Sequence, residues 1–172
     1  IMNQLEVYSK NNMVILVDVD ENMNSYSESV SSYHSSPSEL NMIRTGFKQE
    51  IASRKEGKRS CKERKIVFIN NIKRFNQITG MNEDEVRMLF NEGPKYNVIV
   101  IASGLYSDTI GAFDRESKML TRTVNQSIIG HKISEQEFIK VKDQFGEPEL
   151  KPQEMYIVDN QEYKKLKVIE DV

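Results

Sequence analysis

Three short apolar runs dominate the hydrophobic pattern of the chain, at residues 13–17, 65–71 and 97–101. In each run Val, Ile, Leu, Met or Phe follow one another without regular polar alternation. Such runs are typical of parallel strands whose two faces are both covered. Parallel strands end at one edge of their sheet, and this edge is where such sheets bind ligands. We therefore predict an α/β fold with a mostly parallel sheet.

Two helix starts lie between these runs. Ser36, Pro37 and Glu39 form a capping box with proline at the first helical position, and Asn82 with Glu85 gives a second capping arrangement. Apolar residues at helical spacing follow both starts, and Gly93-Pro94 is expected to stop the second helix. The inward positions predicted in this way are Leu40, Ile43, Phe47, Ile51, Val86, Leu89 and Phe90.

The remaining segments give weaker signals. The serine-rich stretch 22–36 has the composition of a loop. Further on we predict a short strand at 127–130, a helix at 134–142, and a terminal hairpin formed by 155–158 and 165–169. Flanking helices and a C-terminal β-hairpin thus complete the predicted sheet.

The composition predicts one globular domain covering residues 1–172, because 172 residues suffice for a single core. No apolar run approaches the length needed to cross a bilayer. The net charge of −2 argues against a dedicated nucleic-acid binder, which would need a basic face. A single cysteine, Cys61, excludes an internal disulfide, and no metal-ligand spacing is present. We expect no metal site.

The stretch 48–65 is basic, with eight Lys or Arg and three Glu. We expect it to form a helix end and an exposed loop whose charges are solvated. Contact with phosphates or with an acidic partner is the alternative. No aromatic residue interleaves the charges to stack on bases.

A phosphate-binding loop of the G-x-x-x-x-G-K-[ST] type is absent from the chain. The nearest match is Gly57-Lys58-Arg59-Ser60, but Ala52 occupies the first glycine position and the segment follows a predicted helix. Without a cradle of backbone amides the triphosphate of a nucleotide has no primary anchor. We therefore expect no cofactor in this chain, and ATP with magnesium only if residues upstream supply the loop.

The second apolar run ends in two amides, Asn70 and Asn71. At this place P-loop ATPases carry two carboxylates, one that holds magnesium and one that polarises the attacking water. Neutral amides carry no charge for a hard cation and accept no proton at neutral pH. We therefore predict no catalytic residue. Asn70 and Asn71, together with Ser103 after the third run, are predicted as the remnant of a nucleotide site.

A rival interpretation rests on Asp18-Val-Asp20 after the first run. This D-x-D resembles phosphatases of the haloacid dehalogenase type, in which Asp18 would be the nucleophile, Asp20 the general acid, and Ser103 a phosphate contact. The customary glycine and the paired acids at a later strand end are missing. Solvated carboxylates at a strand-to-loop junction are the commoner arrangement.

The order of elements resembles the FtsK/SpoIIIE-type ATPases, most closely the last ATPase module of the membrane motors of Gram-positive type VII secretion. The similarity covers nearly the whole chain and rests on patterns rather than rigid motifs. It is carried by residues 13–18, 65–71 at the Walker B position, 98–104, 106–122, 128–130 and 146–156.

The resemblance implies a RecA-like P-loop NTPase-type fold in which residues 1–8 are the end of the helix after the phosphate loop. We accordingly expect the first strand and that loop to lie upstream, and the chain to be part of a larger membrane protein. Because of Asn70 and Asn71, the implied role is a degenerate module that recruits or recognises secreted proteins or regulates the motor.

The partners implied by the resemblance are neighbouring ATPase modules, secreted protein substrates and other secretion components, at the cytoplasmic face of the bacterial cell membrane. Oligomerisation of the full-length protein is a further expectation. Two alternatives stay open. One is an active DNA-translocase-type motor domain contacting DNA through Lys58, Arg59 and Lys62, and the other is the phosphatase that uses Asp18 and Asp20.

Overall fold

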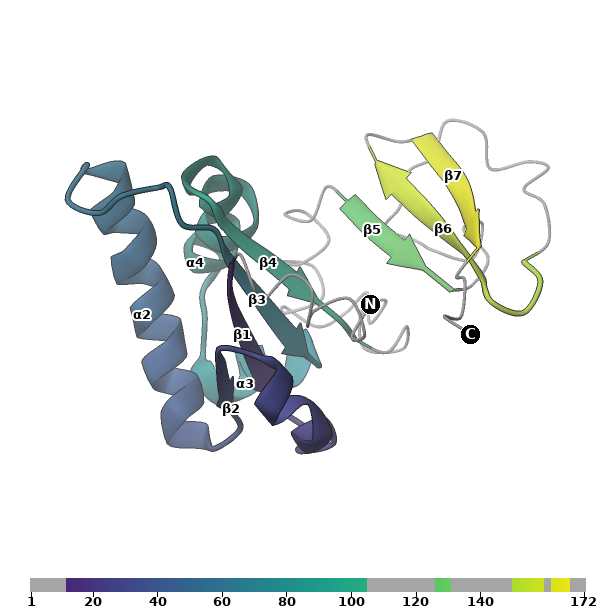
Figure 1. The fold of residues 1–172 in the computed structure, drawn as a ribbon, viewed down its shortest axis with the longest axis horizontal. Helices are drawn as coiled ribbons and strands as arrows, with labels where there is room; N and C mark the ends of the chain where they lie inside the picture. The colour runs from purple at the N-terminus through teal and green to yellow at the C-terminus, as the bar shows by residue number, and fades with distance from the viewer. Residues whose placement is uncertain (1–11, 105–125, 131–149, 160–161, 168–172) are drawn as a thin grey trace. The chain divides into compact units, whose positions relative to one another are not determined.

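The computed structural model describes residues 12–104, 126–130, 150–159 and 162–167 (Figure 1). The chain forms two compact units, residues 1–109 and residues 110–172. The single domain expected over residues 1–172 stays a prediction, because two compact units can belong to one domain. None of the helices in the described ranges is long and apolar enough to cross a bilayer.

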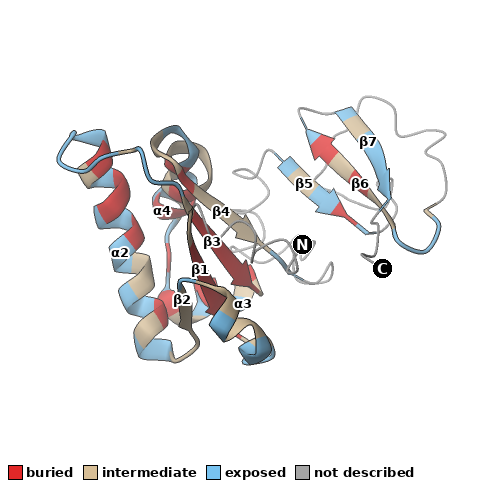
Figure 2. Cartoon of the chain, in the orientation of Figure 1, coloured by how far each residue is buried: buried red, intermediate tan, exposed pale blue. Residues whose placement is uncertain are grey.

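The first unit is built on a four-stranded parallel sheet with the order β2-β1-β3-β4 (Figure 1). Its strands are β1 (Met13–Asp18), β2 (Ser32–His34), β3 (Lys65–Asn70) and β4 (Val98–Ala102). The three apolar runs form β1, β3 and β4, which confirms the predicted strands and the α/β class. In β1 and β3 every residue after the first is buried (Figure 2), as expected for strands covered on both faces.

Helices pack against this sheet and form its core together with the strands. They are α2 (Pro37–Lys55), α3 (Ile72–Thr79) and α4 (Glu83–Arg87), followed by the single-turn helices η2 (Met88–Glu92) and η3 (Gly93–Tyr96). Both predicted capping boxes are present, at the starts of α2 and α4. Of the predicted inward residues, the buried ones are Leu40, Phe47, Ile51, Val86 and Leu89, whereas Ile43 and Phe90 are half-buried.

Three features of this unit differ from the sequence prediction. The stretch 22–36 is not a plain loop, since it contains the 3-10 helix η1 (Asn24–Ser29) and strand β2. Helix α3 was not expected, because it carries only two large apolar side chains, Ile72 and Phe75, on its buried side. Gly93-Pro94 does not end the helical path, which continues as a 3-10 turn to Tyr96.

The second unit contains a three-stranded antiparallel sheet with the order β5-β6-β7. Its strands are β5 (Gln126–Ile129), β6 (Glu154–Asp159) and β7 (Glu162–Lys167), so the short strand and the terminal hairpin are confirmed. Ile129, Tyr156 and Val158 form its core together with Leu150 and Tyr163. The predicted helices at 1–8 and 134–142 lie outside the described residues.

Candidate functional site

Polar side chains from two neighbouring strands meet at the carboxyl edge of the parallel sheet. Asp18 ends β1, Asn70 ends β3, and the two residues are partners in the strand register. The amide nitrogen of Asn70 donates to Asp18 Oδ1 over 2.5 Å, and its amide oxygen accepts from the Val19 backbone N–H over 2.5 Å. Both ends of the Asn70 amide are therefore bound within the protein, which the sequence alone did not indicate.

Asp18 is fully buried (0% exposed) and accepts three further hydrogen bonds. The donors are Tyr33 Oη at 2.7 Å, the Met23 backbone N–H at 2.8 Å and the Asn22 backbone N–H at 3.2 Å. Burial by itself raises the pKa of this carboxyl, but the hydrogen bond from Tyr33 and the other donors outweigh burial and lower the pKa below its ordinary value of 3.8. Asp18 is thus a buried carboxylate whose hydrogen-bond donors all come from its own chain.

The second amide, Asn71, is also engaged. Its amide nitrogen donates to Asp20 Oδ2 over 2.9 Å, and its amide oxygen caps α3 by accepting from the Arg74 backbone N–H over 3.1 Å. The Arg74 guanidinium lies 2.9 Å from Asp20 Oδ1 and completes the triangle. Asn71 has a left-handed backbone with φ of 51°, a conformation that asparagine tolerates better than most residues.

Ser103 follows β4 at the same edge, as predicted. Its backbone N–H donates to Ile69 O over 2.9 Å, and its carbonyl accepts from the Ile72 N–H over 2.9 Å. The residue itself is exposed. The structure therefore places Ser103 beside the ends of β3 and α3, at the edge that also carries Asn70 and Asn71, whereas a role of the three residues in nucleotide binding stays a prediction.

The chemistry open to this edge is narrow. Among the described residues, no group of three His, Cys, Asp or Glu side chains could hold a metal ion. A phosphatase nucleophile must reach its substrate, but the Asp18 carboxylate is buried and hydrogen-bonded to four donors. This arrangement argues against the phosphatase interpretation of Asp18 and Asp20. In the described residues, the Asp18 and Asn70 side chains at this edge hydrogen-bond to groups of the chain itself.

The basic stretch 48–65 is partly turned inward, which the sequence prediction of a solvated loop missed. Glu50 in α2 is buried and contacts Arg54 Nε at 2.7 Å, Lys65 Nζ at 3.3 Å and the Arg59 guanidinium. Arg54, itself only 4% exposed, also donates to the carbonyls of Glu63 and Tyr96 over 2.8 and 2.9 Å. The i,i+4 spacing of Glu50 and Arg54 was the one available signal.

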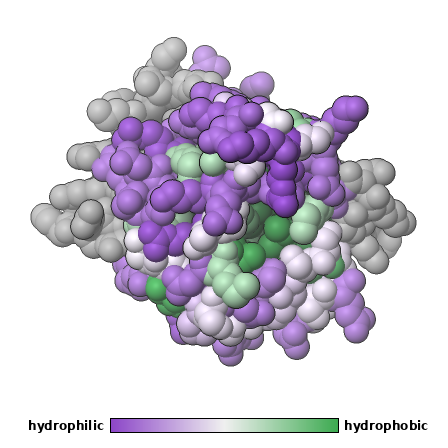
Figure 3. Space-filling view, turned by 90° about the vertical axis from the view of Figure 1, so that its left-hand side faces the viewer, coloured by the Kyte–Doolittle hydropathy of each residue, from purple (hydrophilic) through white to green (hydrophobic). Residues whose placement is uncertain are grey.

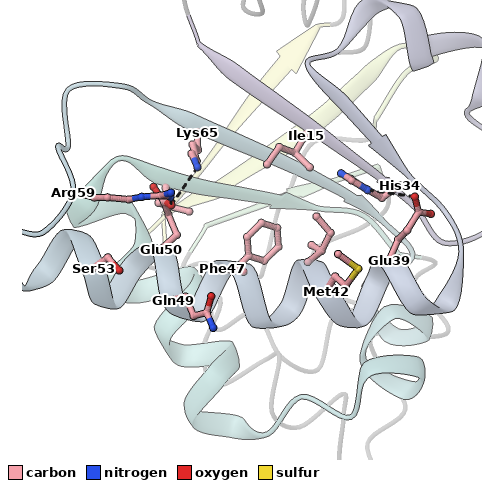
Figure 4. A pocket seen from close by; sticks show the side chains of 13 residues that line it. Ile15, His34, Glu39, Met42, Phe47, Gln49, Glu50, Ser53, Arg59 and Lys65 are labelled. Atoms are coloured by element: carbon pink, nitrogen blue, oxygen red, sulfur yellow. Dashed lines mark hydrogen bonds and ion pairs between the residues drawn. The ribbon is translucent and has the colours of Figure 1, made fainter.

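A groove of about 690 Å³ runs along α2 where the helix meets the sheet (Figure 4). Its apolar lining includes Ile15, Met42, Phe47 and Val98, and Glu50 with its cations lies at one end. Figure 3, which views the side of the molecule that carries α2, shows a hollowed apolar patch surrounded by hydrophilic residues. Hydrophobic spacing in α2 predicted its inward face, but not that part of this face stays open.

No family model matches the chain. The chain is 70% identical over 170 residues to the type VII secretion system protein EssC of Staphylococcus aureus strain MRSA252. The aligned residues are 99% of this chain and 12% of that protein. It is 25% identical over 166 residues to EssC of strain NCTC 8325 / PS 47, or 96% of this chain and 11% of that protein. The chain thus spans about an eighth of the curated relatives it matches.

Solved structures of related proteins share the fold. EssC ATPases 2 and 3 of Geobacillus thermodenitrificans match with a TM-score of 0.64 at 18% identity, covering 98% of this chain and 33% of that one. EccC ATPases 2 and 3 of Thermomonospora curvata, solved with a signal sequence peptide, match with a TM-score of 0.64 at 10% identity, covering 99% and 35%. The cytoplasmic domain of EssC matches with a TM-score of 0.60 at 16% identity, and the match covers 95% of this chain and 34% of that one.

These comparisons confirm two predictions from the sequence, namely the fold class and the relationship to type VII secretion proteins. The fold is that of the RecA-like ATPase domains of EssC and EccC. Along nearly its whole length the chain is related to one segment of EssC, a type VII secretion protein.

Proposed function

We propose that this chain is a degenerate ATPase module of a type VII secretion motor, which recruits or recognises protein substrates or regulates the motor rather than hydrolysing ATP. The observation that carries the proposal is the state of Asn70 and Asn71. In an active P-loop ATPase the corresponding strand end must hold a magnesium ion and a water molecule. Here both amides hydrogen-bond within the chain and carry no charge.

The recognition half of the proposal is supported by two observations. The EccC structure that shares this fold is a complex with a signal sequence peptide. The chain itself keeps an open, partly apolar groove beside α2, and exposed apolar surface of this kind marks interaction sites. A module without chemistry can persist in a motor if it provides such a surface.

The same proposal assigns the surroundings of the module. Its partners are the neighbouring ATPase modules of the same polypeptide, secreted proteins and other components of the secretion system, at the cytoplasmic side of the bacterial membrane. Asn70, Asn71 and Ser103 are the remnant of a nucleotide site. ATP and magnesium bind there only if residues upstream of this chain supply a phosphate loop.

The test compares this chain with a longer protein that includes whatever strand and phosphate loop the upstream sequence supplies. Calorimetric titration with Mg-ATP measures binding, and phosphate release measures turnover. We expect no binding to the shorter chain and no turnover by the module in either form. Turnover that is lost when Asn71 is replaced by Ala would overturn the proposal, because it would make this edge a working active site.

The DNA-translocase alternative gains no support from the charges. Lys58 lies 2.6 Å from Glu56, and Arg59 is paired with the buried Glu50. These cations are partly compensated by carboxylates, and the net charge of the chain is −2, which argues against a broad basic face for DNA. A fluorescence anisotropy titration with duplex DNA at physiological salt should therefore show no saturable binding. Binding that weakens when Lys58, Arg59 and Lys62 are neutralised would favour the translocase instead.

A further inference from the structure

The groove along α2 combines apolar walls with charged ends. Met42 stands in its wall with 71% of its surface exposed, while Phe47 and Ile15 form buried parts of the lining. A methionine held this far into solvent offers apolar area that a partner could bury. All residues that line the groove belong to the first unit.

One end of the groove carries excess positive charge. Arg54, Arg59 and Lys65 share the carboxylate of Glu50, and Glu63 also acts on Lys65, so three cations face two anions. Burial lowers the pKa of Lys65, and the charges of Arg59 and Arg54 lower it further, while Glu63 acts in the opposite sense. The cluster is thus short of negative charge, and an additional carboxylate beside Arg59 and Lys65 would relieve the repulsion.

The other end of the groove carries the opposite charge. Glu39 lines it beside His34, whose Nδ1 lies 3.7 Å from a Glu39 carboxylate oxygen. Hydrogen bonds from Ser36 lower the pKa of Glu39 to about 2, so this carboxylate is ionised at neutral pH. A bound segment is therefore favoured in one direction only, with its acidic group toward Arg59 and Lys65.

The length of the groove limits its occupant. From Glu39 to Glu50 the helix rises about 16 Å at 1.5 Å per residue. An extended segment of roughly five residues, at about 3.3 Å each, spans this distance, as do about three turns of helix. The groove is therefore long enough for a peptide segment, and its apolar walls do not match a free inorganic ion.

We propose that the groove between α2 and the sheet is a docking site for a short apolar segment of a partner protein that carries a carboxylate at the end facing Arg59 and Lys65. The inference rests on the proposed recognition function and assigns it to one surface. Met42 and its apolar neighbours supply the contact area, and the cationic end sets direction and preference.

Selection from a displayed library tests this site. Random peptides of about 12 residues, enough for three helical turns, are selected on the 172-residue chain, and the dissociation constants of the enriched peptides are measured. The enriched sequences should share apolar positions and an Asp or Glu. Replacing that acid by its amide should weaken binding about fivefold, as for the loss of one partly exposed charge contact.

Four protein variants locate the site. Met42→Lys should weaken binding by about tenfold or more by placing a charge in the apolar wall, while Thr45→Lys adds the same charge on α2 outside the groove lining and should have no effect. Arg59→Gln should abolish the preference for acidic peptides, and its matched control Lys62→Gln, in the same loop, should keep it.

The outcomes separate the two proposals. Peptides that bind equally well to Met42→Lys and Arg59→Gln would overturn the groove inference and leave the recognition function standing on another surface. The groove inference would also be overturned if no peptide is enriched on this chain beyond its enrichment on an unrelated acidic protein used as the control target. The absence of catalysis would then still be decided by the nucleotide measurements.

Discussion

Asn70 is the residue on which the carboxyl edge of the sheet depends. A single amide donates to the Asp18 carboxylate and accepts from the Val19 N–H at the same time. An ionised carboxylate can only accept, so it could not make the bond to Asp18. Asp18 in turn binds the backbone of the following turn and Tyr33 of β2. The hydrogen bond from Asn70 to Asp18, together with the bond from Tyr33 to Asp18, thus links β3, β1 and β2.

Asn70→Asp should lower the free energy of unfolding by about 2–4 kcal/mol at pH 7, because it places a second carboxylate against buried Asp18 and removes a donor. Urea unfolding followed by circular dichroism measures the change. Asn41→Asp, an exposed amide in α2, should change stability by about 0.5 kcal/mol or less. Equal stability of Asn70→Asp and the parent chain would refute the structural role of this amide.

Tyr33→Phe should destabilise the chain by about 1–3 kcal/mol at pH 7, since it removes a donor to a buried carboxylate. The folded-state pKa of Asp18 is lowered, so its contribution to stability is present above the ordinary value of 3.8 and is lost as pH falls through the folded value. The difference between variant and parent should therefore narrow below about pH 4. Unfolding curves from pH 7 to pH 3 test this, with Tyr26→Phe, outside the network, as control.

At the scale of elements, strong local signals were reliable. Strands β1, β3 and β4 and the capping boxes of α2 and α4 follow from apolar runs and cap spacing. Helix α3 and strand β2 could not be predicted from such signals, because α3 is anchored by few apolar residues and β2 has only three residues paired to β1. Their formation depends on tertiary contacts that no short window of sequence contains.

The candidate site shows the same division. That Asp18, Asn70 and Ser103 share one edge followed from the parallel arrangement of the strands. The hydrogen bonds of the Asn70 amide could not be predicted, because its partners are 48 to 52 residues away in sequence. The burial of Arg54 was missed for the same reason, since one of its acceptors, the Tyr96 carbonyl, lies 42 residues away in sequence.

Arg54 ties the end of α2 to the loop that follows it and to the turn before β4. Arg54→Met should destabilise the chain by about 3–5 kcal/mol, because Glu50 loses a buried partner and two carbonyls lose their donor. Lys55→Met, one residue on, removes only an exposed pair with Glu92 and should lower stability far less, because exposed ion pairs contribute little. Thermal unfolding of both variants makes the comparison, and similar losses would contradict the assignment.

Two helical glycines should respond in opposite ways to alanine. In Gly93 an added Cβ would lie 2.7 Å from the Val98 carbonyl oxygen, so Gly93→Ala forces η3 away from β4 and should destabilise the chain by about 1–3 kcal/mol. In Gly46, exposed in α2, nothing lies within 4 Å, and Gly46→Ala should stabilise it by about 0.5–1 kcal/mol. Chemical denaturation decides both signs.

At the scale of the whole molecule, the chain joins a RecA-like unit without a phosphate loop to a small antiparallel sheet. Its relatives are about eight times longer, since the chain spans 12% of the first one.

The double change Asn70→Asp with Asn71→Glu should not produce ATP turnover in this chain, because two carboxylates do not replace the missing phosphate cradle. Phosphate release at saturating Mg-ATP is the measurement, with circular dichroism to verify that the variant is folded. Turnover above that of the parent chain would contradict the explanation and would mean that some other group anchors the triphosphate.

The left-handed backbone of Asn71 has a consequence for substitution at this edge. A glutamate at this position would meet a φ of 51°, which costs about 1 kcal/mol or more for a residue with a longer side chain, and it would remove the cap of α3. An aspartate at position 70 would face Asp18. Each single change to a carboxylate at these two positions is therefore expected to give a less stable protein, so the amide pair can be replaced by acids only at a cost in stability.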